Sequence, residues 1–101
     1  MVKHVILWTL KPEYSHDEKE RIKARIKNSL EGLYGKIPGL LEMKVNIHPL
    51  PGSNADLMLD STFESEDALR IYATHPAHIA VANAMVRPYT ATRHCMDFLA
   101  E

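Results

Sequence analysis

The sequence predicts an α+β protein of the ferredoxin-like, split βαβ type, with the element order strand, helix, strand, strand, helix, strand. Two observations support this prediction. Four segments have the apolar, alternating character of strands, and two segments between them carry apolar residues at helical spacing. The predicted strands are 2–10, 40–48, 55–64 and 90–99, and the helices begin after Ser15 and Ser65. Residues 1–101 are expected to form a single domain, with both helices on one face of a four-stranded antiparallel sheet.

The composition narrows the function classes. The chain is 46% hydrophobic and 25% charged, with a formal net charge of −1 when histidines are neutral, which is typical of a globular protein. No basic face or run of like charges favours nucleic acid, and the apolar start is too short for a membrane span. The single cysteine, Cys95, excludes an internal disulfide. We therefore expect a cytoplasmic protein without a nucleic-acid or membrane partner.

The first half of the chain gives clear element signals. Residues 2–10 are rich in β-branched and aromatic residues and precede Lys11-Pro12, as expected for a strand. Ser15 and Glu18 have the spacing of a capping box, and the helix that follows is expected to end at Gly35 and residues 37–39. Its apolar face comprises Ile22, Ile26, Leu30 and Leu33.

The strand patterns separate two faces of the sheet. One strand places Leu41, Met43, Val45 and Ile47 on a common face, and the next places Leu57, Leu59, Ser61 and Phe63 on a common face. The last strand separates Arg93, Cys95 and Asp97 from His94, Met96 and Phe98. Either face of the whole sheet would carry large apolar residues, for example Val5, Leu7, Met58, Met96 and Phe98. The helices cover only one face, so we expect a homodimer that buries the other.

The second helix is expected to break at Pro76, because proline lacks a backbone N–H and favours an extended residue before it. On one continuous helix, Tyr72 and His78 would point to nearly opposite sides. Across a break they can converge. Beyond the break, Ile79, Ala82, Met85 and Val86 keep a helical period.

Short motifs along the chain resemble the stress-responsive A/B barrel (Dabb) family. They are Val2-Lys3-His4, Thr62-Phe63-Glu64-Ser65, His75-Pro76-Ala77-His78 preceded by Tyr72, and Asp97-Phe98. The resemblance covers essentially the entire chain and implies a dimeric α+β barrel, in which two sheets pack face to face. A plant polyketide cyclase of this family closes its substrate by an aldol reaction without a cofactor. Its histidine–tyrosine pair resembles His78 and Tyr72, and its first-strand histidine and closing-strand aspartate resemble His4 and Asp97. Its aromatic-rich first helix is replaced here by Ile22, Ala24 and Ile26, so an elongated polyketide is not the expected substrate.

The candidate chemistry centres on His78 as a general base, since histidine titrates closest to neutral pH. Tyr72 would hold it or polarise a carbonyl oxygen, and His4, Trp8 and Asp97 would contact the substrate. In the alternative interpretation, His78 caps the broken helix, and Tyr72 and Trp8 fill the core. His75 is expected to be a capping or surface group.

A metal site is an alternative use of the same histidines. His75 and His78 could be joined by His94, Cys95 or Asp97, but zinc needs three or four converging ligands and His94 faces away from Cys95 and Asp97. We expect neither a metal nor another cofactor. Two functions remain: a cofactor-free cyclase or lyase acting on a small, largely apolar carbonyl compound, and a non-catalytic small-ligand-binding or stress-response dimer. A cavity of a few hundred Å³ reaching His78 would favour the enzyme.

Overall fold

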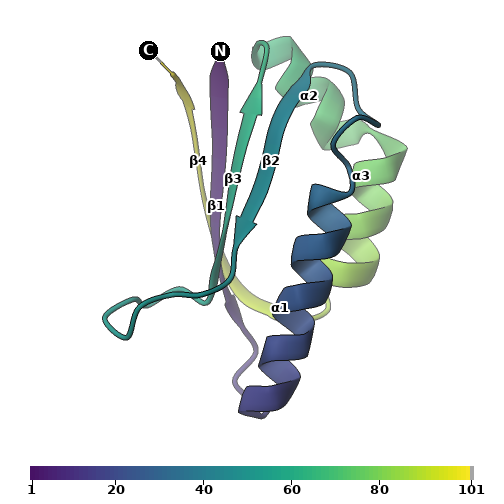
Figure 1. The fold of residues 1–101 in the computed structure, drawn as a ribbon. Coiled ribbons are helices and arrows are strands. Elements are labelled where there is room, and N and C mark those ends of the chain that lie inside the picture. Colours follow the sequence, from purple (N-terminus) through teal and green to yellow (C-terminus); the bar gives the residue numbers. More distant parts are fainter. Residues whose placement is uncertain (101) are drawn as a thin grey trace.

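The structure, a computed structural model, describes residues 1–100. Within them, a four-stranded antiparallel sheet carries all helices on one face, so the predicted fold class is confirmed (Figure 1). The strands are β1 (Val2–Leu10), β2 (Leu40–Asn46), β3 (Leu57–Phe63) and β4 (Thr90–Leu99), in the spatial order β2-β3-β1-β4. The helices are α1 (His16–Glu31), α2 (Glu66–Thr74), α3 (Pro76–Val81) and the π-helix η1 (Ala82–Val86). No helix in the described range is long and apolar enough to cross a membrane.

Strand β1 lies between β3 and β4 and sets which side chains face the helices. Its buried residues are Val2, His4, Ile6, Trp8 and Leu10, which alternate with residues on the open face. His4 lies opposite Ser61 of β3 and Asp97 of β4. Directly opposed residues share a face, so Cys95 and Arg93, which pair with Ile6 and Trp8, also face the helices.

Helix α1 begins as predicted, with Ser15 and Glu18 forming both hydrogen bonds of a capping box. It ends at Glu31, earlier than expected, because the chain passes at Gly32 into turns closed by i→i+3 hydrogen bonds. The Glu31 carboxylate accepts hydrogen bonds from Lys27 Nζ at 2.7 Å and from the backbone N–H of Val45 at 2.9 Å. This fixes the end of α1 to the edge strand β2.

The predicted common face of β2 is wrong at Leu41. The register between β2 and β3 shifts between Leu40 and Glu42, so Leu40 takes the buried place and Leu41 is 39% exposed. Such a shift puts one extra residue on one strand and reverses the facing of residues on either side of it. Both middle strands are also shorter than the predicted 40–48 and 55–64.

The predicted break at Pro76 is confirmed. His75 adopts extended backbone angles, ends α2 and begins α3, and its Nδ1 accepts a hydrogen bond from the N–H of Ala77. Of the residues predicted at helical spacing beyond the break, Ala82 and Val86 are buried, whereas Ile79 and Met85 are exposed. The chain widens there into η1, closed by the Arg87 N–H to Ala82 carbonyl bond of a π-helix.

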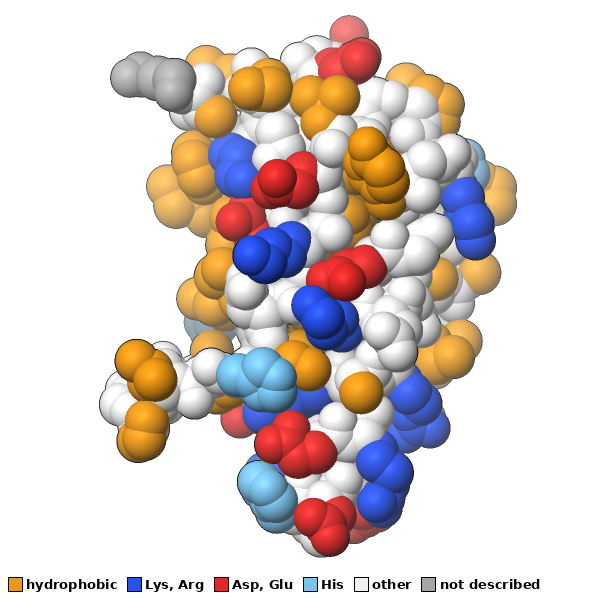
Figure 2. Space-filling view, viewed as in Figure 1, with side chains coloured by type: hydrophobic (Ala, Val, Ile, Leu, Met, Phe, Trp, Pro, Cys, Tyr) orange, Lys and Arg blue, Asp and Glu red, His pale blue; other side chains and the backbone are white. Residues whose placement is uncertain are grey.

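The sheet face away from the helices is uncovered. Met96, 66% exposed, lies there with Leu7 and Phe98, beside an ion pair of 2.5 Å between Lys3 and Asp60. The loop between β2 and β3 extends away from the body of the molecule (Figure 1). The face seen in Figure 2 mixes acidic, basic and apolar side chains, with no region of a single charge.

Candidate ligand site

A cavity of about 380 Å³ lies between the sheet and the helices. Four of the five predicted site residues line it: His4 and Trp8 from β1, Tyr72 from α2 and His78 from α3. Its other walls are Ile6, Leu30, Leu59, Ala73, Ala82, Val86, Arg87, Thr90 and Arg93. The cavity lining is therefore mixed: apolar side chains make up about half of it, and two histidines, a phenol and two guanidinium groups make up most of the rest.

Tyr72 and His78 stack across the helix break. Their ring centroids are 4.1 Å apart with an angle of 31° between the ring planes. Tyr72 is 2% exposed, and its ring also packs against Phe63 at a centroid distance of 5.0 Å and His4 at 6.0 Å. Proline at the first position of α3 thus brings together two side chains that a continuous helix would separate.

His78 is held in its neutral form. Burial from solvent lowers the pKa of its imidazole, and the positive charge of Arg87 acts in the same direction. Its Nδ1 lies 3.3 Å from the carbonyl oxygen of Ala73. Since a carbonyl oxygen only accepts hydrogen bonds, Nδ1 carries the proton and Nε2 keeps a free lone pair. A neutral imidazole of this kind can accept a proton.

The pKa of Tyr72 is shifted in the opposite direction to that of His78. Burial raises the pKa of its phenol, and the nearby Arg93 guanidinium only partly opposes this effect. The phenol therefore stays protonated at neutral pH and can donate a hydrogen bond.

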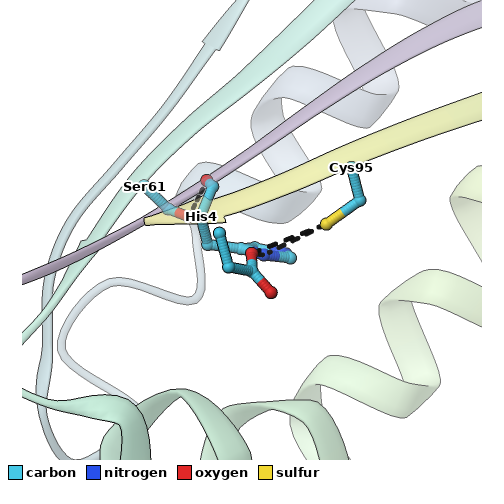
Figure 3. Close-up of polar contacts among 4 residues, drawn as sticks. His4, Ser61 and Cys95 are labelled. Carbon is cyan, nitrogen blue, oxygen red and sulfur yellow. Dashed lines mark hydrogen bonds and ion pairs between the residues drawn. The ribbon is translucent and has the colours of Figure 1, made fainter. Parts of the chain in front are cut away.

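His4, Asp97 and Cys95 form a polar cluster between β1 and β4. His4, 7% exposed, is within hydrogen-bond distance of the Asp97 carboxylate through Nδ1. The Sγ atom of Cys95 lies 3.7 Å from that Nδ1 and 3.5 Å from Asp97 Oδ1. Figure 3 shows Cys95 directed at His4, and the Ser61 hydroxyl donating to the His4 carbonyl at 2.7 Å. The partial desolvation of the largely exposed Cys95 thiol raises its pKa, and the Asp97 charge adds to this effect.

Asp97 does not line the cavity of His78. It lines a second hollow of about 490 Å³ with Val2, Arg70 and Leu99 among others. Ala73 borders both spaces. Each of the two hollows is therefore lined by one member of the His4–Asp97 pair.

Sequence reasoning missed that Cys95 approaches His4. No local sequence signal marks this contact, because it depends on the register of the first and last strands, which places Cys95 and Asp97 on one face beside His4. His75 is a helix cap and His94 pairs with Leu7 on the open face, so neither can join His78 around a metal. In residues 1–100, the one group of three converging potential metal ligands is His4, Cys95 and Asp97.

Comparisons with known proteins agree with this architecture. The sequence model of the Stress responsive A/B Barrel Domain family matches residues 2–100. Comparison with curated protein sequences gives no match.

Three solved structures are similar to the chain. A dimeric protein of unknown function with a ferredoxin-like fold from Bacteroides fragilis is 31% identical over 96% of this chain and 93% of that chain, with a TM-score of 0.87. A dimeric ferredoxin-like protein of unknown function from Thermobifida fusca is 25% identical over 98% and 90%, with a TM-score of 0.78. A hydroxynitrile lyase from Passiflora edulis is 18% identical over 99% and 93%, with a TM-score of 0.74, a similarity that concerns the fold alone.

Proposed function

Since the chain belongs to the stress-responsive A/B barrel (Dabb) family, we propose that it binds a small, largely apolar carbonyl compound between its sheet and helices. We further propose that it moves a proton on this compound without a cofactor. The stacked pair of His78 and Tyr72 at the cavity carries the proposal. A volume of about 380 Å³ lies within the range of small-molecule sites and suits a compact ligand.

The two rings have complementary protonation states. His78 offers the free lone pair of a neutral imidazole, which can take a proton from the carbon next to a carbonyl group. Tyr72 offers a protonated phenol, which can donate a hydrogen bond to the enolate oxygen that then develops. Ring closure by an aldol reaction begins with such a proton transfer, and the reverse cleavage of a carbon–carbon bond ends with its reversal, when the enolate carbon takes a proton back.

The remaining predicted residues would bind and orient the ligand. Trp8 supplies an apolar wall, and His4 supplies a polar group held by Asp97. Because the Asp97 carboxylate accepts from Nδ1 of His4, Nε2 of His4 is free to accept a hydrogen bond from a ligand hydroxyl. Asp97 would thus act on the ligand through His4.

A non-catalytic role is the second candidate, and two contacts favour it. His78 hydrogen-bonds the carbonyl of Ala73 near the end of α2, as a helix cap does. Tyr72 is among the largest fully buried side chains of the described residues, as expected for a core residue. On this interpretation the cavity binds a ligand without changing it.

We also propose that the chain forms a homodimer through the open sheet face. One support is the exposed apolar surface formed by Leu7, Met96 and Phe98. Another is the extended loop beside this surface, because the loop and Leu7 together line a hollow of about 400 Å³. The similar proteins from Bacteroides fragilis and Thermobifida fusca are described as dimeric.

Exchange of α-hydrogens in D₂O tests the enzymatic proposal without knowledge of the natural substrate. Cyclohexanone and acetophenone serve as probes, and NMR follows the loss of their α-proton signals. We expect His78→Ala to remove most of the protein-dependent exchange, because general-base catalysis contributes roughly 10²–10⁴-fold. The exposed His16→Gln variant is the matched control and should behave like the wild type.

The same samples distinguish the two candidates. If the wild type shifts the NMR signals of cavity residues on adding a ketone but exchanges no hydrogen, the binding role is correct. If neither ketone binds nor exchanges, the proposal of a carbonyl ligand is wrong. Melting temperatures measured in parallel show whether His78→Ala loses exchange while remaining folded.

A further inference from the structure

We propose that His4, Cys95 and Asp97 form a Zn²⁺ site at the junction of β1 and β4. One ligand atom from each residue lies within 4.8 Å of the other two. The strand register creates this convergence: His4 lies opposite Asp97, and Cys95 lies two residues along β4 on the same face. The donors are an imidazole nitrogen, a thiol sulfur and a carboxylate oxygen, which are the three ligand types that zinc takes in proteins.

The distances fit one shared metal ion. Zinc–ligand bonds of ~2.0–2.3 Å in a tetrahedron place neighbouring ligand atoms ~3.4–3.6 Å apart. Cys95 Sγ lies 3.7 Å from His4 Nδ1 and 3.5 Å from Asp97 Oδ1, close to these values. The third pair, His4 and Asp97, is closer because the two are hydrogen-bonded. The Asp97 side chain is 47% exposed, so it has room to separate from the ring when the ion enters.

The cluster combines a fixed ligand with an open approach. His4 is buried, its ring packs edge-on against Phe63 and Tyr72, and its backbone carbonyl accepts from Ser61. Cys95 and Asp97 lie on an edge strand with exposed side chains. Zinc can therefore enter from solvent, and the fourth coordination position is left for water or an external ligand.

The charges also balance. Binding releases the Cys95 thiol proton to solvent and moves the imidazole proton of His4 from Nδ1 to Nε2. The resulting thiolate and carboxylate neutralise the two charges of the ion, which limits repulsion from Arg93 on the same face of β4. Mg²⁺ prefers an all-oxygen octahedral shell, so this donor set selects against it.

Cobalt substitution in the purified protein tests the site. Co²⁺ added to the reduced protein should give a sulfur-to-metal charge-transfer absorption band at one equivalent per chain, and Zn²⁺ should remove the band by displacing Co²⁺. Cys95→Ser should abolish the band, and Asp97→Asn should weaken Zn²⁺ binding by on the order of 100-fold in a chelator competition assay. His94→Gln is the matched control, since this neighbouring histidine faces the opposite side of β4. It should bind like the wild type.

Four outcomes would overturn the proposal: no band in the wild type, a band that survives Cys95→Ser, an unchanged Zn²⁺ affinity in Asp97→Asn, or a band that His94→Gln removes. If one substitution unfolds the chain, the other still decides the question, because each removes a different ligand. The experiment uses metal ions alone and no carbonyl probe. Its failure would therefore leave the proposed proton transfer at His78 and Tyr72 untouched.

Discussion

Replacing His78 by phenylalanine should remove a pH dependence of stability while keeping the ring that stacks on Tyr72. In the folded protein the pKa of His78 lies below its ordinary value, mainly because burial disfavours the charged imidazolium. In the unfolded chain the pKa returns to about 6.5. Between these two values the unfolded chain binds more protons than the folded protein, so protonation favours unfolding.

The free energy of unfolding of the wild type should therefore fall as the pH falls. The wild type keeps the full contribution of neutral His78 above about pH 6.5 and loses it as the pH falls toward the lowered pKa. For one proton, the unfolding free energy cannot change by more than about 1.4 kcal/mol per pH unit. His78 is only half-buried, so solvent screening keeps the slope below this limit.

Urea unfolding of the wild type and of His78→Phe between pH 5 and pH 8 provides the assay. The difference in unfolding free energy between the two proteins isolates His78 from the other histidines, and this difference should change in favour of the variant as the pH falls. An NMR titration of the His78 ring gives the pKa directly. A measured pKa at or above the ordinary value would refute the reasoning, and with it the role of His78 as a neutral base.

Three further predictions concern the fold and its assembly. Gly39→Ala should lower the free energy of unfolding by about 2–5 kcal/mol in a urea titration, because φ is +78° there and the new Cβ would lie 2.5 Å from Ala68 Cβ. Gly52→Ala is the control and should leave this free energy almost unchanged, because the new Cβ would have no atom within 4 Å. Leu7→Asp should convert the expected dimer to a monomer, as measured by sedimentation at low micromolar concentration, because it places a charge on the open sheet face. Ile71→Asp, on the exposed side of α2, should leave the dimer intact. A monomeric wild type would disprove the dimer. Glu31→Gln should lower the unfolding free energy by about 1 kcal/mol at pH 7, because it weakens the contact with Lys27; an unchanged value would show that this contact contributes nothing.

Local sequence signals were enough for most of the fold. The capping box at Ser15, the proline at position 76 and the alternation in residues 2–10 each act through neighbouring residues, and each appears in the structure as predicted. The shift at Leu41 could not be predicted in this way. It depends on how β2 aligns with β3, and a single extra residue has no distinct pattern in the sequence.

The same distinction applies to the candidate site. The approach of Tyr72 and His78 could be anticipated, because it follows from a local break between two helices. The approach of Cys95 to His4 could not, because it depends on the register between two strands at opposite ends of the chain. The π-helix was also missed, since its wider turn depends on packing rather than on the residues of 82–86 alone.

The pairing of β1 with β4 also governs when the site can exist during synthesis. His4 and Asp97 are 93 positions apart in the sequence, so their contact carries a large loop-closure cost and belongs to the slow, non-local part of folding. On the ribosome, which exposes the chain from its N-terminus, β1, β2, β3 and the helices can associate before residues 90–99 emerge. Arg93, Cys95 and Asp97 then arrive together on the last strand. A nascent chain that has buried much of its core would therefore still lack the polar wall beside His4 until this final segment pairs.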